Sequence, residues 1–406
     1  MRARRRLAPL LVLLAACSSS PAPTGPSQLP DEGDARILQR VLDGTLAPAD
    51  GLQQVAASGG WPIQTSRGFL FATLDGGYGP YQLTSPNGAF NAIELKSEAG
   101  VAWGLAAVPT PAGATYRYLT HYGDGFADPL SRRFLYTQGE VGLVAAGGPH
   151  LERWTAVGGV DPRIAPRTLR VWVPADPPTH FLYAHDGQNL FNPAGPNGGW
   201  RPDLAAASTT LIVGIDNTSA RMQEYTHAPD YGIADPWGAL YADYVEQVVR
   251  PFIQAHYGVP AKTGVMGSSL GGLITLFINL RFPGRYDFVA SLSGTVGWGS
   301  LQPGLQNPTL IESYLALPAC PAGVLYLDSG GGPGTGCLDS DRDGIFDDGT
   351  GEDNYCENAQ LRDVLAGLGC GASLHYAWEP GASHDEAAWK YRVNRAGGVL
   401  DLFEAL

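Results

Sequence analysis

Apolar residues in the second half of the chain form short continuous runs that alternate with stretches of helical spacing. The runs at 181–184, 264–266 and 324–327 have the length of buried strands, whereas Leu270–Arg281 is long enough to be a helix. Strands that alternate with helices are typical of an α/β fold with a mostly parallel central sheet. We therefore expect such a domain over residues 151–406.

The first half has a different pattern. Apolar residues in 36–64 have the spacing of a short helical segment. The sequence from 69 to 144 consists of short apolar runs broken by Gly, Pro and Asn. Short strands separated by turn residues are typical of a β-sandwich, which we expect over 65–150. A chain of 406 residues exceeds one typical core, in agreement with two domains.

The junction between strand 264–266 and the following helix carries the candidate chemistry. Gly267, Ser269 and Gly271 form the pattern G-x-S-x-G, the nucleophile elbow of α/β-hydrolases. Glycine is needed where this sharp turn leaves no room for a Cβ atom, and the serine hydroxyl is left exposed above the sheet. The pentapeptide is weak evidence in a chain with 54 glycines, but its strand-turn-helix setting strengthens it. Ser269 is the predicted nucleophile, with the backbone N–H of Leu270 as an oxyanion donor.

Two histidines follow the predicted nucleophile, and in this fold the base comes last in the order Ser, acid, His. His375 lies in an alternating run that reads as a strand. His384 lies in a loop after that run and before a helical segment, where it can reach a serine at the carboxyl end of the sheet. We predict that His384 is the general base.

Several ordered segments resemble the esterase-D-type branch of α/β-hydrolases, which contains enterochelin-esterase-like and feruloyl-esterase-like enzymes. The resemblance covers about 167–406 and rests on these segments: 182–191 (LYAHDGQNLF), 213–217 (VGIDN) with Arg221 and Glu224-Tyr225, 251–253 (PFI), the elbow, and 381–389 with His384. It implies hydrolysis of a carboxylic ester through an acyl-serine intermediate, with no cofactor for catalysis. It also favours the backbone N–H of Gln188, or alternatively Gly187, as the second oxyanion donor.

His185 and Asp186 precede the serine, so we expect them to shape the loop rather than to form a second catalytic pair. The segment 65–150 is similar to the early-set, glycogen-binding-type modules that precede many enterochelin-esterase-like enzymes. The similarity rests on residues 86–91, 115–118 and 128–133. Trp61 and Trp103 are expected to pack in its core rather than to bind sugar.

The triad acid has two candidates. Asp328 ends the apolar run 324–327, and the family usually places its acid after a glycine turn, shortly before a helix. Here the insertion 329–357 separates the turn from a helix expected near Asn358. Asp353 directly precedes that helix, and we prefer it to Asp328.

The insertion has a metal-ligand pattern of its own. Oxygen ligands recur at Asp339, Asp341, Asp343 and Asp347 with glycine at position 6, a spacing that suits a structural Ca²⁺. Thr350 stands where an EF-hand has its bidentate glutamate, so the loop is more like an isolated calcium loop of extracellular proteins; a solvated acidic loop is the alternative.

Apart from Cys17 the chain has four cysteines, an even number that allows disulfides and therefore agrees with export. Cys320, Cys337, Cys356 and Cys370 allow three pairings. We prefer Cys337–Cys356, which closes the acidic loop, together with Cys320–Cys370. A zinc site is not expected, because no Cys-x-x-Cys spacing occurs.

The first residues predict the location. A basic start is followed by an apolar stretch at 7–16 that is too short to span a bilayer, and Leu14-Ala15-Ala16-Cys17 resembles a bacterial lipobox. We expect residues 1–17 to form a lipoprotein signal and lipobox, with lipid on Cys17. Residues 18–35 then form a flexible Pro/Ser-rich linker. The expected site is the bacterial cell envelope, at the outer membrane or cell surface; a plain secretory signal is the alternative.

Composition limits the function classes. A net charge of −13 argues against nucleic-acid binding, and 44% hydrophobic residues indicate a folded chain. The predicted function is serine carboxylic-ester hydrolysis of a small-molecule or glycan-linked ester. Acyl transfer by the same fold branch, or a catalytically inactive surface binding protein, are the alternatives.

Overall fold

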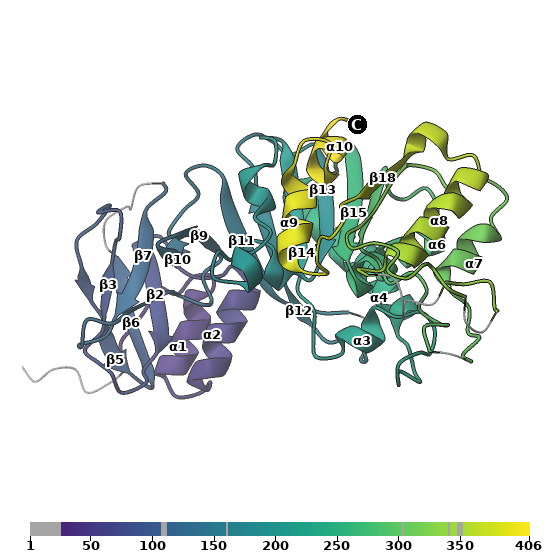
Figure 1. Ribbon diagram of the computed structural model, residues 1–406. Coiled ribbons are helices and arrows are strands. Elements are labelled where there is room, and N and C mark those ends of the chain that lie inside the picture. Colours follow the sequence, from purple (N-terminus) through teal and green to yellow (C-terminus); the bar gives the residue numbers. More distant parts are fainter. Residues whose placement is uncertain (1–25, 107–111, 160, 303, 340–341, 347–351) are drawn as a thin grey trace, which may run out of the picture.

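The computed structural model describes residues 26–106, 112–159, 161–302, 304–339, 342–346 and 352–406. Two regions lie side by side in Figure 1: short strands and two helices from the N-terminal part, and a large sheet covered by helices from the C-terminal part. The predicted lipobox, including Cys17, lies outside the described residues. No helix among those described is long and apolar enough to cross a membrane.

The N-terminal region begins with two helices and continues as short strands. The helices are α1 (Ala35–Leu42) and α2 (Pro48–Ala57). The strands are β1 (Ile63–Thr65), β2 (Gly68–Leu74), β3 (Gln82–Thr84), β4 (Ile93–Glu94), β5 (Lys96–Glu98), β6 (Val101–Ala106), β7 (Thr115–Leu119), β8 (Gly125–Phe126), β9 (Arg133–Thr137) and β10 (Gly139–Leu143).

Two layers of strands enclose a core in this region. A four-stranded sheet in the order β1-β2-β6-β5 contributes Phe71 and Ala102, which pack with Leu83 and Tyr116 from β3 and β7 of the other layer. The opposite face of β2 and β6 packs against α1 and α2, and Trp61 is buried there with its indole N–H donated to the Leu52 carbonyl. Burial on both faces explains why β2 and β6 are nearly continuous apolar runs.

The large sheet is built mainly from the part of the chain that begins at His150. Its strands there are β11 (His150–Val157), β12 (Arg167–Val173), β13 (His180–His185), β14 (Thr210–Ile215), β15 (Lys262–Ser268), β16 (Phe288–Leu292), β17 (Val324–Ser329) and β18 (Leu374–Trp378). They are ordered β18-β17-β16-β15-β13-β14-β12-β11, and all neighbours from β14 to β18 run parallel. Because they are parallel, their carboxyl ends meet at one edge.

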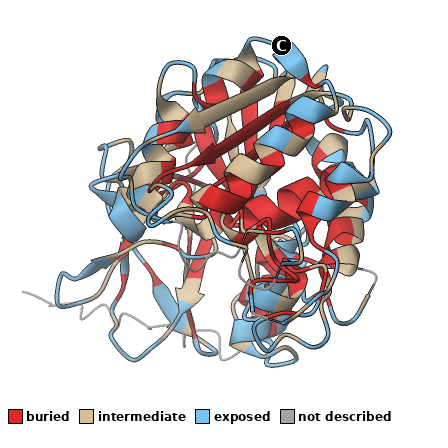
Figure 2. Ribbon diagram, turned by 45° about the vertical axis from the view of Figure 1, so that its right-hand side comes forward, coloured by how far each residue is buried: buried red, intermediate tan, exposed pale blue. Residues whose placement is uncertain are grey.

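Helices cover both faces of this sheet. They are α3 (Arg221–Glu224), α4 (Gly238–Tyr244), α5 (Arg250–Tyr257), α6 (Leu270–Arg281), α7 (Leu310–Leu315), α8 (Tyr355–Gly367), α9 (Glu386–Asn394) and α10 (Val399–Glu404). Along β13, Phe181 and Tyr183 face the core under α4 to α8, whereas Leu182 and Ala184 face the core under α9 and α10. The central strands and the helix behind the elbow are almost wholly buried in Figure 2. The predicted α/β-hydrolase fold with an N-terminal sheet domain is confirmed.

One feature of the fold was not expected from the sequence. Strand β11 pairs with β12 on one side and with β9 on the other, where Leu151 lies opposite Phe134. The large sheet therefore continues without a break into the N-terminal strands β9, β10 and β7. This continuity attaches the N-terminal layer to the catalytic sheet through backbone hydrogen bonds.

Candidate active site

A sharp turn at the end of β15 places Ser269 above the edge of the sheet. Ser269 has φ 55° and ψ −123°, outside the regions that ordinary residues favour, and α6 begins at the next residue. A Cβ atom on Gly267 would lie within 3.0 Å of the Gly271 backbone, so only glycine fits there. The backbone N–H of Leu270 belongs to the first turn of α6, where it has no intrahelical acceptor.

A chain of hydrogen bonds joins three side chains from separate segments. Nε2 of His384 lies 2.9 Å from Oγ of Ser269, and Nδ1 of His384 lies 2.6 Å from Oδ1 of Asp353. The Asp353 side chain is 1% exposed, and that of His384 is 36% exposed. A proton on Nδ1, donated to the carboxylate, leaves Nε2 free to accept the serine proton.

The loop that carries His384 is held at both ends. Strand β18 precedes it, and His375 lies in that strand as expected. On the other side Asp385 caps α9 by accepting the N–H groups of Ala387 and Ala388, each at 3.0 Å. The ring of Trp389 meets the imidazole edge to face, with centroids 5.0 Å apart. These contacts orient the imidazole without blocking Nε2.

Three further donors fix the second oxygen of Asp353. Oδ2 accepts hydrogen bonds from Oγ of Ser293 at 2.8 Å, from the Gly330 N–H, and from Arg392 Nη2 at 3.3 Å. These three hydrogen bonds prevent the carboxylate from rotating, so Oδ1 remains directed at His384. Sequence reasoning missed Ser293 and Arg392, because nothing local marks them: they lie 60 and 39 residues from Asp353.

Asp328 occupies a different position from Asp353, at the buried end of β17. It is wholly buried and forms an ion pair with Arg392 at 2.5 Å. Its carboxylate also accepts from the Tyr326 hydroxyl at 3.0 Å and from the Ser293 N–H at 2.9 Å. Arg392 therefore bridges two buried carboxylates, of which Asp353 contacts the imidazole.

His185 and Asp186 form contacts that shape the loop after β13. Asp186 binds Arg221 through two hydrogen bonds, at 2.8 and 2.9 Å, and accepts from the Asn217 amide. His185 is enclosed by aromatic rings and accepts or shares a proton with the Tyr241 hydroxyl at 2.9 Å. Burial lowers the pKa of His185 to about 4, so the imidazole is neutral at pH 7. Within the described part of the chain neither residue forms a hydrogen bond with Ser269, and both shape the backbone of the next turn.

That turn carries Gln188. It follows β13, which lies beside β15 in parallel register, so the turn and the elbow share one edge of the sheet. The Gln188 side chain accepts the N–H of Asn217 at 3.1 Å and is thereby tied to the loop after β14. The side-chain oxygen is thus engaged by that loop, and the backbone N–H is the group that we predict as the second oxyanion donor.

The insertion is fixed by disulfides. Cys337 pairs with Cys356 and Cys320 with Cys370, at Cα–Cα distances of 5.4 and 4.9 Å. This is the pairing that the sequence favoured. Cys356 is three residues beyond Asp353, which has φ 55°. The N–H of Glu352 is donated to the Gly332 carbonyl, so the turn with Asp353 is bound to the glycine turn after β17.

The acidic loop is described only in part, because Asp341 and Asp347 lie outside the described residues. Asp339 accepts the backbone N–H groups of Asp343 and Gly344, at 3.1 and 3.0 Å, so the loop folds around its first carboxylate. Among the described residues, no group of three or more His, Cys, Asp or Glu is placed to hold a metal ion. Calcium binding stays a prediction.

Comparison with known families gives one match that covers more than half of the chain. The model of the family described as putative esterase matches residues 165–395, a range that includes Ser269, Asp353 and His384. The chain belongs to the putative esterase family. An uncharacterised Bacillus subtilis protein, YbbA, is 30% identical over 112 residues, and the match spans 44% of that relative.

Three solved structures are among those similar to this chain. The enterobactin esterase of Shigella flexneri is 16% identical, with a TM-score of 0.44, and the alignment covers 89% of this chain and 99% of that one. An IroE-like serine hydrolase from Shewanella oneidensis is 16% identical over 63% of this chain and 80% of its own, with a TM-score of 0.46. Mycobacterium tuberculosis MPT51 is 13% identical over 59% of this chain and 94% of its own, with a TM-score of 0.40.

Proposed function

We propose that this esterase-family protein hydrolyses carboxylic esters through an acyl-serine intermediate. The observation that carries the proposal is the continuous hydrogen-bonded chain from Ser269 through His384 to Asp353. Asp353 orients the imidazole and stabilises its charged form, His384 is the base, and Ser269 is the nucleophile.

The reaction proceeds in two halves. Oγ of Ser269 attacks the ester carbonyl carbon while Nε2 of His384 takes the serine proton. The C–O bond of the ester then breaks, and His384 returns that proton to the departing alcohol. A water molecule, deprotonated in turn by His384, attacks the acyl-serine carbonyl carbon. The bond from that carbon to Oγ of Ser269 breaks, His384 returns the proton to Oγ, and the acid is released. The N–H groups of Leu270 and Gln188 are the proposed donors to the oxyanion in both halves.

The rival functions share parts of this scheme. Acyl transfer would use the same intermediate with an alcohol in place of water, and the partition between them is set by the acceptor. A catalytically inactive binding protein has no use for a strained serine hydrogen-bonded to a histidine that a buried carboxylate orients, so this alternative is disfavoured. The substrate is proposed to be a small-molecule or glycan-linked ester.

An ester panel tests the proposal. The purified protein is assayed with p-nitrophenyl esters of increasing chain length, hydroxycinnamoyl esters, acetylated sugars and a siderophore ester, with and without an acceptor alcohol. Release of free acid from at least one ester is expected. Products that form only as transferred esters would favour acyl transfer, and no turnover of any ester would contradict the proposal.

The disulfide at Cys337–Cys356 is expected to hold the catalytic acid in place. Replacing both cysteines by alanine frees the turn before α8, and misplacement of a catalytic group by about 1 Å can cost about 10²-fold in rate. We expect kcat to fall by up to that factor with little change in KM. The Cys320→Ala/Cys370→Ala pair is the matched control, since that disulfide connects the start of β17 with the end of α8, whereas Asp353 lies at the opposite ends of these two elements. Equal kcat losses in both pairs would contradict this role.

Calcium is proposed to stabilise the acidic loop without entering the chemistry. A ligand that binds only the folded state raises the melting temperature, and extracellular calcium sites bind in the range of about 10⁻⁴ to 10⁻³ M. We expect millimolar Ca²⁺ to raise Tm by differential scanning calorimetry in the wild type and not in Asp339→Asn/Asp343→Asn, with kcat unchanged. If Tm stays constant, the loop is a solvated acidic segment.

We further propose that the protein is a lipoprotein of the bacterial cell envelope, tethered through Cys17. Globomycin should make the unprocessed precursor accumulate, and Cys17→Ala should abolish labelling by a radioactive fatty acid. Ser18→Ala serves as the control and should keep the label. A mature protein that begins at Cys17 and carries no lipid would contradict the anchor.

A further inference from the structure

Two exposed tyrosines lie on neighbouring loops of the N-terminal region. Tyr78, between β2 and β3, is 58% exposed, and Tyr122, between β7 and β8, is 71% exposed. His121 joins the two loops, since its backbone N–H and its ring Nδ1 lie 3.2 and 2.7 Å from the Tyr78 carbonyl oxygen. Its ring also lies against that of Tyr122, with centroids 3.5 Å apart. A joined group of exposed rings is a candidate contact surface, unlike a single exposed ring. We call residues 76–80 and 121–125 the tyrosine tip.

The backbone of the tyrosine tip is fixed from below. Tyr81 is 2% exposed, and its hydroxyl accepts the N–H groups of Gly76 at 3.0 Å and Tyr78 at 3.3 Å. Small residues surround the two tyrosines, because 76–80 reads GGYGP and 121–125 reads HYGDG. Few neighbouring side chains can therefore cover the rings. Tyrosines presented in this way supply a large amphipathic contact area at a low cost in conformational entropy.

The described chain enters the fold beside the tyrosine tip. The N–H of Ser27 is donated to Glu98 at 2.9 Å, and Nζ of Lys96 is donated to the Ser27 hydroxyl, so this residue is bound to β5. The same strand contacts the tyrosine tip, because a Cβ atom on Gly79 would lie 3.5 Å from Oγ of Ser97. In Figure 1, β3, β5 and β7 lie at the end of the molecule away from the helices α6 to α8 of the catalytic sheet.

The proposed lipid anchor lies a short way before this entry point. Pro26 is nine residues after Cys17, and nine residues span at most about 30 Å. A lipid on Cys17 would therefore keep β5 and the tyrosine tip within that distance of the bilayer. Such a tether raises the effective concentration of the tip at the lipid surface, so a contact too weak to form from solution can form.

The chemistry of the tyrosine tip suits one kind of lipid surface. Tyrosine is enriched at the boundary between lipid and water, where the ring packs against apolar groups and the hydroxyl stays hydrated. The charges beside the rings are acidic, with Asp75 and Asp124, and neither 75–81 nor 120–126 contains Lys or Arg. Lys96 on β5 is already paired with Glu98 at 2.8 Å. Anionic headgroups would be repelled, so zwitterionic headgroups are favoured.

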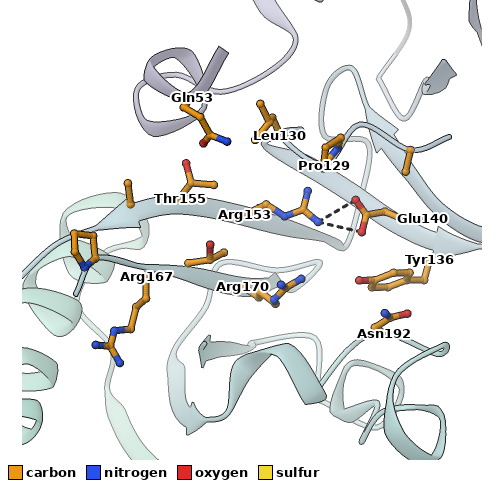
Figure 3. A pocket seen from close by; sticks show the side chains of 14 residues that line it. Gln53, Pro129, Leu130, Tyr136, Glu140, Arg153, Thr155, Arg167, Arg170 and Asn192 are labelled. Atoms are coloured by element: carbon orange, nitrogen blue, oxygen red, sulfur yellow. Dashed lines mark hydrogen bonds and ion pairs between the residues drawn. The ribbon is translucent and has the colours of Figure 1, made fainter. Parts of the chain in front are cut away.

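We propose that the tyrosine tip rests on a zwitterionic phospholipid surface, with Tyr78 and Tyr122 at the interface. This inference rests on the lipid anchor of the proposed function. The catalytic sheet would follow the tyrosine tip, because β11 continues it into the N-terminal strands. In the wall of the cavity drawn in Figure 3, Arg153 of β11 also binds Glu140 of β10 through two hydrogen bonds, at 2.9 and 3.0 Å. The contact thus sets the orientation of the catalytic sheet toward the membrane.

A chemical tether tests the surface separately from lipidation in the cell. Protein that begins at Cys17 is coupled through this thiol to a maleimide phospholipid in phosphatidylcholine vesicles, since the other four cysteines form disulfides. Amide hydrogen exchange of the peptides that cover 75–82 and 118–126 is compared with that of the same protein in solution, its Cys17 capped by N-ethylmaleimide. We expect exchange about threefold to tenfold slower on the vesicles, because the contact must open first. Vesicles enriched in phosphatidylglycerol should protect less.

Two variants separate the tyrosine tip from a general effect of the vesicles. Tyr78→Ser/Tyr122→Ser should lose the protection, with Tm unchanged because both side chains are exposed. Tyr231→Ser, which removes a tyrosine that is 57% exposed on the catalytic half, is the matched control and should keep it.

Several outcomes would overturn the proposal. They are equal exchange on vesicles and in solution, protection that persists in Tyr78→Ser/Tyr122→Ser, or stronger protection on anionic vesicles. Protection that appears without vesicles as the protein concentration rises would assign the tyrosine tip to a second copy of the chain instead. Because the tether is made chemically, an absence of lipid on Cys17 in cells would contradict the anchor alone, and the two failures are distinguishable.

Discussion

Replacing Ser269 by alanine is expected to lower kcat for ester hydrolysis by up to about 10⁶-fold, the loss found when the nucleophile of a serine protease is removed. The reason is that no acyl-enzyme can form without Oγ, whereas the turn and α6 are unaffected because alanine also fits the elbow. Steady-state hydrolysis of the best ester of the panel measures the loss.

Ser268→Ala is the matched control for this variant. Ser268 is the last residue of β15 and is 4% exposed. It directly precedes the nucleophile within the elbow but has no hydrogen bond to His384 among the described residues. Its removal should change kcat by less than about tenfold, since it removes no interaction with the reacting atoms. Full activity in Ser269→Ala, or an equal loss in Ser268→Ala, would contradict the assignment of the nucleophile.

Asp353→Asn is expected to lower kcat by up to about 10⁴-fold with little change in KM. An amide in place of the carboxylate can donate a hydrogen bond to Nδ1 and so favours the tautomer whose Nε2 carries hydrogen and cannot accept the serine proton. The imidazolium that forms during the reaction also loses its counter-charge. Parallel measurement of kcat, KM and Tm separates this effect from a loss of folding.

Asp328→Asn provides the contrast, because Asp328 shares Arg392 with Asp353 but contacts no ring nitrogen of His384. Loss of one partner of a buried ion pair costs about 3–5 kcal/mol of stability. We therefore expect a lowered Tm and a kcat loss much smaller than that of Asp353→Asn. A large loss of turnover in Asp328→Asn at unchanged Tm, with Asp353→Asn active, would reverse the two roles.

The sequence predicted those parts of the site that local patterns encode. Ser269 is marked by the glycines of its turn, and His384 by its position after the last strand. The fold was predictable for the same reason, because alternating strands and helices leave a clear periodicity. The choice between Asp353 and Asp328 was harder, since an insertion separates the glycine turn from α8.

Other features depend on contacts between residues far apart in the chain. Ser293 follows β16 and Arg392 lies on the buried face of α9, yet both bind Asp353. No local spacing shows that these two segments meet at the insertion. Likewise, the pairing of β11 with β9 joins the N-terminal strands to the catalytic sheet, where the sequence pattern indicated only a change from one domain to the next.

The central claim is that Ser269 is an activated nucleophile, and covalent labelling tests it most directly. The wild-type protein is treated with a fluorophosphonate, and mass spectrometry of its peptides locates the phosphonyl group while the remaining hydrolysis of an ester is measured. One adduct on Ser269, with hydrolysis lost in proportion to labelling and no adduct in Ser269→Ala or His384→Ala, is the result we predict. An adduct on another residue, or full ester hydrolysis by protein labelled completely on Ser269, would contradict the account.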